Sequence, residues 1–228
     1  MIKKISLLAS LFICLAFVCN IKAQQKENNR VKILVETNKG KFTIELYNET
    51  PLHKQNFINL VSSHAYDGVI FHRVIKDFMV QGGNLMTKHA TAKTDVTQDT
   101  LKRTVPAEIM TDQIFHVRGS LCAAREPDES NPEKASSGSQ FYIVTGKYYT
   151  AFDLSELEAK KHIKFSDKQK EAYMHEGGTP SLDGGYTVFG RVIDGWNVID
   201  KIQRVETDGI DRPIKDVIIK SMHIIAPK

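Results

Sequence analysis

Cysteine is scarce in this chain of 228 residues, and the three cysteines present exclude a disulfide framework. Cys14 and Cys19 lie in an apolar N-terminal segment, so Cys122 stands alone in the rest of the sequence. A single cysteine can neither close an intramolecular disulfide nor complete a cysteine-based metal site. Its apolar setting, Leu121-Cys-Ala-Ala124, favours a small buried residue over a reactive nucleophile.

The body of the chain also lacks an excess of one charge. The full sequence has 31 basic and 27 acidic side chains, which gives a formal net charge of +4. Three of the basic residues, Lys3, Lys4 and Lys22, lie in residues 1–23, which contain no acidic residue. Subtracting them leaves 28 basic against 27 acidic side chains, a net charge of +1. This balance gives no electrostatic reason to expect nucleic acid as a partner.

Long hydrophobic runs are absent except at the N-terminus. Two lysines precede a mostly apolar run of 15 residues that ends at Cys19, and Ile21-Lys-Ala23 offers a small residue for cleavage. A membrane-spanning helix needs about 20 apolar residues, so we expect a cleaved signal peptide over residues 1–23, an exported, periplasmic protein and no membrane span after cleavage. Two alternatives stay open: an uncleaved membrane anchor, and a lipid anchor on Cys19, against which the bulky Val18 argues.

A polar linker at residues 24–30 precedes a single domain, residues 31–228, that is rich in predicted strands. Short alternating or apolar runs between turn residues predict strands over residues 31–37, 41–46, 68–74, 79–82, 119–124, 140–144, 187–193 and 217–225. One helix is expected after Thr50-Pro51, with the threonine as N-cap, and another over residues 196–204. Many strands and two core helices favour a mainly β protein, a closed antiparallel barrel capped by helices.

Two segments interrupt this pattern. Residues 87–103 are polar, with four basic side chains and no apolar rhythm, and we expect an exposed loop. Residues 152–178 are expected to form two short helices inserted into the domain. Asp153-x-x-Glu156 and Ser166-x-x-Gln169 resemble capping boxes, and two glycines follow the second helix.

The usual signatures of hydrolases, metalloenzymes and nucleotide-binding enzymes are missing. There is no His-Glu-x-x-His, Gly-x-Ser-x-Gly, Gly-x-Gly-x-x-Gly or P-loop motif, and the eight histidines have no metal-ligand spacing. We therefore expect no metal ion and no cofactor. One dense run remains, Phe71-His-Arg-Val-Ile-Lys-Asp-Phe-Met-Val-Gln-Gly-Gly83. By spacing alone, a half-buried strand with an exposed Arg73 is the simplest interpretation of this run.

This run resembles the signature of the cyclophilin family of peptidyl-prolyl cis–trans isomerases. Three further blocks resemble family motifs in the same order: residues 118–125, the Ser137-Gly-Ser-Gln-Phe-Tyr-Ile143 block, and the Leu182-Asp-Gly-Gly-Tyr-Thr-Val-Phe-Gly190 block. The resemblance covers residues 31–225 apart from the two interruptions. It implies an eight-stranded barrel with two capping helices, and a member of the family's exported bacterial branch.

The resemblance also implies a role for each matching residue. Arg73 is expected to donate to the prolyl nitrogen of a twisted amide, with Phe78 beside it and Gln81 either binding the substrate backbone or orienting Arg73. The substrate-binding set is Met79, Tyr142 and Leu182 around the proline ring, Ala124 and Arg125 through their main chains, Gln140 at a neighbouring subsite, and Tyr186. Tyr142 and Tyr186 depart from the family pattern, which usually has Phe and often His at these places. The insertion at residues 152–178 is expected to form a flap near one subsite.

The implied reaction needs no nucleophile, metal or general base. Rotation about an X–Pro bond faces a barrier of about 18–20 kcal/mol, so an enzyme must bind the twisted amide better than either planar isomer. We therefore expect a monomeric peptidyl-prolyl isomerase that acts on proline-containing polypeptides and assists the folding of exported proteins. The alternative is a chaperone or assembly module that binds proline segments with little turnover, and Arg73 favours the enzyme.

Overall fold

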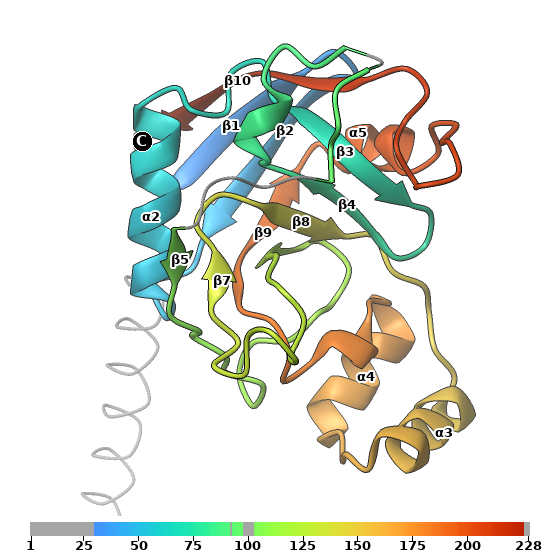
Figure 1. Ribbon diagram of the computed structural model, residues 1–228. Helices are drawn as coiled ribbons and strands as arrows, with labels where there is room; N and C mark the ends of the chain where they lie inside the picture. Colours follow the sequence, from blue (N-terminus) through green and yellow to red (C-terminus); the bar gives the residue numbers. More distant parts are fainter. Residues whose placement is uncertain (1–29, 92, 98–102, 226–228) are drawn as a thin grey trace, which may run out of the picture.

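The computed structural model describes residues 30–91, 93–97 and 103–225 (Figure 1). The predicted signal peptide at residues 1–23 and all but the last residue of the predicted linker lie outside the described residues. Within the part that is described, no helix is long and apolar enough to cross a membrane.

Eight strands close into an antiparallel barrel in the order β1-β10-β3-β4-β8-β6-β9-β2 (Figure 1). Their bounds are β1 (Lys32–Thr37), β2 (Gly40–Leu46), β3 (Ile70–Ile75), β4 (Met79–Gly82), β6 (Ser120–Ala123), β8 (Phe141–Val144), β9 (Val188–Asp194) and β10 (Val217–Ile225). Every strand expected from the sequence is confirmed, with ends shifted by two residues or fewer. The sequence did not predict β5 (Thr104–Val105) and β7 (Ser136–Ser137), which form a separate two-stranded sheet.

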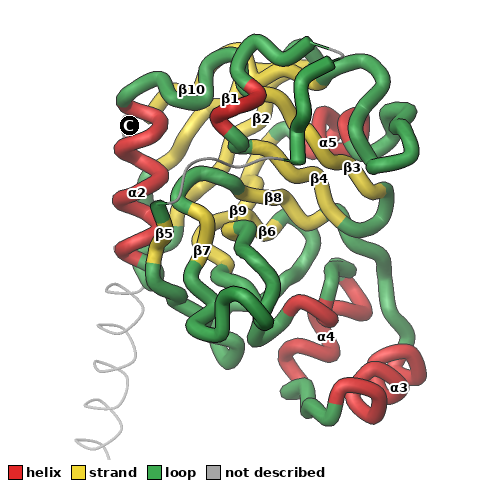
Figure 2. The backbone as a smooth tube through the Cα atoms, in the orientation of Figure 1, coloured by secondary structure: helices red, strands yellow, loops and turns green. Residues whose placement is uncertain are grey.

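The interior of the barrel is filled by the apolar side chains that alternate along its strands. Ile33 and Val35 of β1 and Phe42 of β2 are at most 2% exposed, and they share one core with Phe57 and Val61 of helix α2 (Pro51–Ser62). Successive side chains of a strand point to opposite faces, so one face of each strand enters the core. Each such side chain contributes roughly 1.5–3 kcal/mol of hydrophobic stabilisation. Helices α2 and α5 (Trp196–Ile202) lie on different sides of the barrel (Figure 2).

The start of α2 is capped by a distant residue and not by its neighbour. Thr50 is in the predicted N-cap position, but its side chain makes no capping hydrogen bond. The Glu108 carboxylate instead accepts from the backbone N–H groups of Leu52 and His53, each at 3.0 Å. His53 is held on both sides, because Nδ1 lies 2.7 Å from Glu108 Oε2 and Nε2 lies 2.8 Å from Ser136 Oγ. The predicted N-cap position of Thr50 is therefore confirmed, but the Glu108 carboxylate, and not the threonine hydroxyl, satisfies the free N–H groups of the first turn.

The predicted insertion forms two helices, α3 (Ala151–Lys161) and α4 (Asp167–His175). The Ser166 and Gln169 capping box is confirmed at α4. The box of α3 joins Thr150 to Asp153, so the box predicted to begin at Asp153 is wrong by three residues. A threonine hydroxyl can accept from the N3 backbone N–H while the N3 carboxylate accepts from the N-cap backbone, and this reciprocal pair sets where the helix begins.

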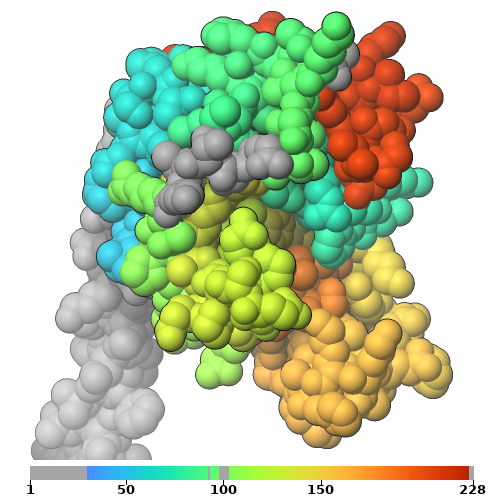
Figure 3. Space-filling model, viewed as in Figure 1, coloured from blue at the N-terminus to red at the C-terminus, as the bar shows by residue number. Residues whose placement is uncertain are grey.

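A small apolar cluster joins the insertion to the rest of the domain. Phe115, which precedes β6, packs with Leu154 of α3, with Tyr173 of α4 and with Phe165, which lies between these two helices. Tyr173 and Leu154 are completely buried. Figure 3 shows the insertion as a lobe that protrudes from one end of the barrel. The lobe therefore has its own apolar centre, to which Phe115 and Val117 from the segment before β6 also belong.

The expectation of an exposed loop at residues 87–103 is partly wrong. Thr87 is completely buried and Val96 is 6% exposed. Residues 98–102 lie outside the described part of the chain.

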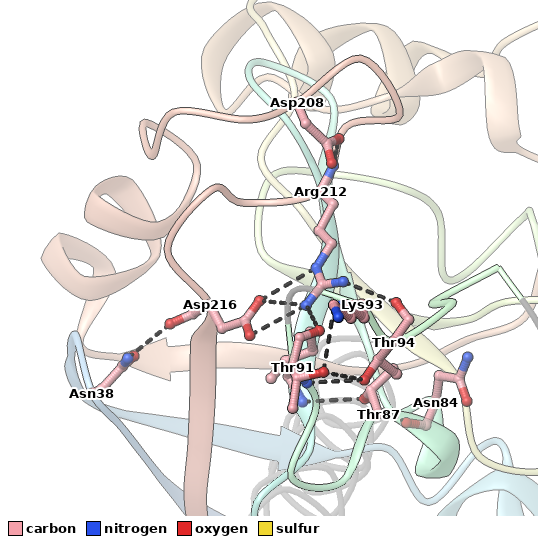
Figure 4. A network of polar contacts seen from close by, with 10 residues as sticks. Asn38, Asn84, Thr87, Thr91, Lys93, Thr94, Asp208, Arg212 and Asp216 are labelled. Carbon is pink, nitrogen blue, oxygen red and sulfur yellow. Dashed lines mark hydrogen bonds and ion pairs between the residues drawn. The ribbon is translucent and has the colours of Figure 1, made fainter.

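Arg212, on the segment between α5 and β10, fixes this loop. Its two Nη atoms donate to the backbone oxygens of Thr94 at 2.9 Å and Thr91 at 3.0 Å, and Nη2 also pairs with the Asp216 carboxylate at 3.1 Å (Figure 4). The Arg212 backbone N–H donates to Asp208 Oδ1 at 3.0 Å. A guanidinium has five N–H donors in a fixed plane, so one arginine can join several backbone groups of a loop that has little apolar content.

Candidate active site

Three adjacent strands position the predicted catalytic residues. In the antiparallel pair of β3 with β4, Arg73 lies opposite Gln81, and in the pair of β4 with β8, Gln81 lies opposite Tyr142. Directly opposed residues of antiparallel strands project their side chains to the same face, about 5 Å apart. The strand register therefore brings a guanidinium, an amide and an aromatic ring into one row.

These side chains border a cavity of about 200 Å³. Nine of the ten predicted site residues line it: Arg73, Phe78, Met79, Gln81, Ala124, Arg125, Tyr142, Leu182 and Tyr186. The tenth, Gln140, lines an adjoining cavity of about 630 Å³ that shares Gln81, Ala124 and Arg125 with the first. We call the first the proline-sized pocket and the second the adjoining cavity. No residue of α3 or α4 lines either cavity, so the prediction that the insertion forms a flap near one subsite gains no support from these linings.

One wall of the proline-sized pocket is apolar and largely buried. Met79 and Tyr142 are 3% and 4% exposed and pack with Cys122. Leu182 and Tyr186 are partly buried and pack on the same cluster. Burial raises the pKa of the Cys122 thiol well above its usual value, so the thiol stays protonated and is a packing group, as the sequence predicted.

The other wall carries Arg73, whose side chain is 45% exposed. Its Nε donates to Asp211 Oδ2 at 3.3 Å. The backbone N–H of Val74 also donates to the Asp211 carbonyl at 2.8 Å, so Asp211 is fixed beside β3. In the described part of the chain, the two Nη atoms of Arg73 make no hydrogen bond with protein. They are therefore free to donate to a substrate.

Gln81 does not orient Arg73 in this structure. Its Nε2 donates to Gln140 Oε1 at 2.9 Å, which places the Gln81 amide between the two cavities. Asp211 holds Arg73 instead, and sequence reasoning missed it because it lies 138 residues further along the chain. It has a positive φ of 66°, which asparagine, aspartate and glycine tolerate better than other residues.

The main chain of Ala124 is less available than the resemblance implies. Its N–H donates to the Gln140 carbonyl at 3.0 Å, and its carbonyl accepts from Ser137 at 2.8 Å. Only the second lone pair of that carbonyl is left for a substrate. The Arg125 side chain is held more firmly than expected, because its Nε donates to the Gly185 carbonyl at 2.6 Å and its guanidinium lies 4.7 Å from the Tyr186 ring centroid.

Two further polar residues, which the sequence did not single out, lie behind the apolar wall. His116 Nε2 lies 3.0 Å from the Tyr142 hydroxyl, and His116 Nδ1 lies 2.8 Å from Asp183 Oδ1. Burial is the main cause that raises the pKa of the Tyr142 phenol well above its usual value, so this hydroxyl keeps its proton. Two features of the sequence could have pointed to this contact: the tyrosine in place of the family's phenylalanine at position 142, and the aspartate of the Leu-Asp-Gly block.

A family model described as "Cyclophilin type peptidyl-prolyl cis-trans isomerase/CLD" matches residues 32–224. The chain belongs to this family. A protein of Staphylococcus epidermidis described as a peptidyl-prolyl cis-trans isomerase is 33% identical over 199 residues, which cover 87% of this chain and 93% of that protein. A Staphylococcus aureus protein of the same description is 32% identical over 206 residues, which cover 90% of this chain and 95% of that protein.

Solved cyclophilin structures resemble the barrel as well. A crystal structure of a cyclophilin type peptidyl-prolyl cis-trans isomerase from Cryptosporidium parvum superposes with a TM-score of 0.61 at 26% identity, covering 86% of this chain and 98% of that one. A second crystal structure of the same protein, in the presence of the dipeptide ala-pro, gives a TM-score of 0.59, also at 26% identity, and covers 86% and 99% of the two chains. The sequence-based expectations of a closed eight-stranded barrel and a cyclophilin-type isomerase acting on proline-containing peptides are confirmed.

Proposed function

We propose that this cyclophilin-type isomerase catalyses rotation about X–Pro bonds at the proline-sized pocket and acts on exported polypeptides. One observation carries the assignment of the site: the free Nη atoms of Arg73 lie at the edge of a pocket of about 200 Å³ whose other wall is apolar. A proline ring fits an apolar pocket of this size, and the amide nitrogen on that ring then lies near the guanidinium.

The chemistry follows from the geometry of a twisted amide. In a planar amide the nitrogen lone pair is delocalised into the carbonyl, so the nitrogen accepts no hydrogen bond. When the bond twists, the lone pair localises on nitrogen, and an Nη of Arg73 can donate to it. This contact exists only in the twisted state, so it lowers the barrier and does not merely tighten binding.

One hydrogen bond cannot supply the whole effect. An acceleration of about 10⁵ corresponds to roughly 7 kcal/mol, whereas a hydrogen bond to a charged group contributes about 1.5–3 kcal/mol. The remainder must come from holding the proline ring still while the preceding residue rotates. We assign the first task to Met79, Tyr142 and Leu182, and contacts with the rotating side to Gln81, Gln140 and the main chain of Arg125.

A chaperone that merely binds proline segments is the second candidate. Such a protein needs the apolar wall but has no use for an arginine whose two Nη atoms make no hydrogen bond with the described residues. The Arg73 side chain is 45% exposed, so water can satisfy these donors until a substrate replaces it. The geometry of Arg73 therefore favours turnover over simple binding.

The decisive experiment measures isomerisation of an Ala-Pro peptide by exchange NMR with the purified protein and its Arg73→Ala variant. Arg73→Ala should lower kcat/KM about 100-fold or more at an unchanged melting temperature, because Arg73 is half exposed and its removal leaves no buried void. Arg204→Ala is the matched control, since Arg204 is an exposed arginine outside both cavities. A folded Arg73→Ala protein that keeps most of its activity would refute the assigned mechanism.

Export of the protein rests on the N-terminal sequence. The mostly apolar run after Lys3-Lys4 and the candidate cleavage site at Ala23 support a secreted, periplasmic isomerase that assists the folding of other exported chains. Fractionation of cells followed by N-terminal sequencing tests this. A mature chain beginning at Gln24 supports cleavage, a lipidated Cys19 supports the anchored alternative, and an intact N-terminus in the cytoplasm refutes export.

A further inference from the structure

Two departures from the family pattern, the tyrosine at position 142 and the helical insertion, are joined by a chain of hydrogen bonds. The Tyr142 hydroxyl contacts His116 Nε2 at 3.0 Å, and His116 Nδ1 contacts Asp183 Oδ1 at 2.8 Å. The other carboxylate oxygen of Asp183, Oδ2, accepts from the Tyr173 hydroxyl at 2.6 Å and from Gln169 Nε2 at 3.2 Å. Tyr173 and Gln169 both belong to α4 of the insertion. We call this chain the relay.

All side chains of the relay are buried. Tyr142, His116, Tyr173 and Gln169 are at most 7% exposed, and the Asp183 side chain is 5% exposed. A buried carboxylate is stable only when charged or polar groups satisfy it, and Asp183 has four donors, because the His116 backbone N–H also donates to Oδ1 at 3.0 Å. The relay is thus a fully connected interior network and not a set of adventitious surface contacts.

The chemistry of the partners fixes the direction of each bond. A carboxylate only accepts, so the Tyr173 hydroxyl, the Gln169 amide and His116 Nδ1 all donate to Asp183. With a neutral imidazole, which has one N–H, the proton on Nδ1 leaves His116 Nε2 to accept, and Tyr142 then donates its hydroxyl proton to it. The Tyr142 hydroxyl is thereby used behind the wall and is not presented to the pocket.

Ring contacts connect His116 and Tyr142 to a second residue of the pocket, Tyr186. The His116 and Tyr142 rings lie nearly parallel, 12° apart with centroids 6.2 Å apart. Tyr186 meets both rings edge-on, with its centroid 5.8 Å from that of Tyr142 and 6.4 Å from that of His116. A rotation of the His116 ring would therefore disturb both aromatic residues of the proline-sized pocket.

We propose that the insertion positions the aromatic wall of the proline-sized pocket through the relay. Tyr173 and Gln169 fix the Asp183 carboxylate, Asp183 fixes the tautomer and plane of His116, and His116 holds the Tyr142 ring with its hydroxyl turned away from the proline. Tyr173, Asp183 and His116 are positioning residues, because none of them lines the proline-sized pocket. The inference rests on the proposed function of this pocket.

A double-mutant cycle tests the coupling. Tyr173→Phe keeps the ring in its apolar cluster and removes only the hydroxyl that donates to Asp183. We expect kcat/KM for an Ala-Pro peptide to fall about 3- to 10-fold, with kcat changing more than KM, because a less fixed wall binds the planar substrate nearly as well. In a Tyr142→Phe background the same change should have no further effect, since the hydroxyl that the relay holds is already absent.

Tyr149→Phe is the matched control for this cycle. Tyr149 packs against Tyr173 in the same cluster, with ring centroids 6.3 Å apart, but its hydroxyl makes no hydrogen bond with the described residues. Its variant should retain full activity. Equal losses from Tyr149→Phe and Tyr173→Phe, or losses that simply add in the Tyr142→Phe background, would overturn the proposal.

A spectroscopic measurement separates failure of the relay from failure of the proposed function. Nitrogen-15 NMR of the full protein should show His116 protonated at Nδ1 and unprotonated at Nε2, and the Nδ1–H signal should move in Tyr173→Phe but not in Tyr149→Phe. Addition of an Ala-Pro peptide should shift the His116 signals. The opposite tautomer, or signals insensitive to Tyr173→Phe, would refute the relay even in an active isomerase, whereas a correct tautomer in an inactive protein would refute only the proposed function.

Discussion

The two walls of the proline-sized pocket are held in place by different means. Arg73 and Asp211 are 45% and 43% exposed and share one hydrogen bond of 3.3 Å. Behind the opposite wall, Asp183 is 5% exposed and accepts four hydrogen bonds. An exposed pair contributes about 0–1 kcal/mol and leaves its arginine free to move, whereas a buried network is rigid and is costly to break.

This difference matches what each wall has to do. In the proposed mechanism the guanidinium approaches a nitrogen that becomes an acceptor only in the twisted state, so some freedom of the Arg73 side chain is useful. In the same mechanism the aromatic wall holds a proline ring still throughout the reaction, so its support should not fluctuate. Water screens the exposed Arg73–Asp211 pair, so the guanidinium can move. Water is excluded from the buried network behind the aromatic wall, so that network stays rigid.

Removal of the insertion should give the largest effect. Joining the chain across residues 152–178 would expose Phe115 and leave Asp183 without two of its donors. We expect the free energy of unfolding to fall by about 3–5 kcal/mol, a large share of a typical 5–15 kcal/mol. Urea denaturation measures this change. A deletion variant as stable as the full chain would show that the insertion is an independent appendage.

Asp183→Asn should have the next largest effect, because it places an amide N–H₂ where four donors converge. Leaving a buried donor unpaired costs roughly 1–3 kcal/mol, and the free energy of unfolding should fall by about that amount. The matched variant on the exposed wall is Asp211→Asn, for which we expect a change below about 0.5 kcal/mol. Denaturation curves of the two variants test the comparison directly, and equal losses of stability would refute it.

Asp211 should matter for activity more than for stability. Asparagine and glycine both tolerate the positive φ of 66° at position 211. Asp211→Asn weakens the acceptor of Arg73 Nε, and Asp211→Gly removes it. We expect kcat/KM to fall about 3- to 10-fold, more for glycine, because the guanidinium then samples more orientations. Glu36→Gln, which breaks the exposed pair with Lys41 on the β1–β2 hairpin, serves as the control. Unchanged kinetics in both Asp211 variants would show that Arg73 needs no partner.

The smallest effect concerns a second buried group, His53 at the start of α2. Burial, which outweighs the neighbouring Glu108 carboxylate, lowers the pKa of His53 in the folded protein below its usual value. The unfolded chain therefore binds more protons near pH 6, and the free energy of unfolding should decrease as the pH falls below about 6.5. Urea titrations between pH 5 and 8 measure this slope. His53→Gln should reduce it, whereas a variant of the exposed His64 should not.

Local sequence signals determined most of the barrel. Alternation of apolar residues along residues 31–37 and 41–46 is enough to predict a hairpin with one buried face, and Ser166-x-x-Gln169 predicts the start of α4, because each depends on neighbours a few residues apart. The order of four family motifs then identified nine of the residues that line the proline-sized pocket. These motifs contain the side chains to which we assign contact with the substrate.

Only the tertiary structure decided which residues hold those side chains in place. Glu108 caps α2 from 55 residues away, Asp183 reaches His116 over 67 residues, and Asp211 reaches Arg73 over 138. Glu108 and Asp211 are ordinary acidic residues whose neighbours in the sequence give no sign of the contact, and the Leu-Asp-Gly block marks Asp183 without indicating His116 as its partner. A carboxylate finds its donors through space, after the barrel has closed and excluded water, so no pattern of short period along the chain encodes the pair.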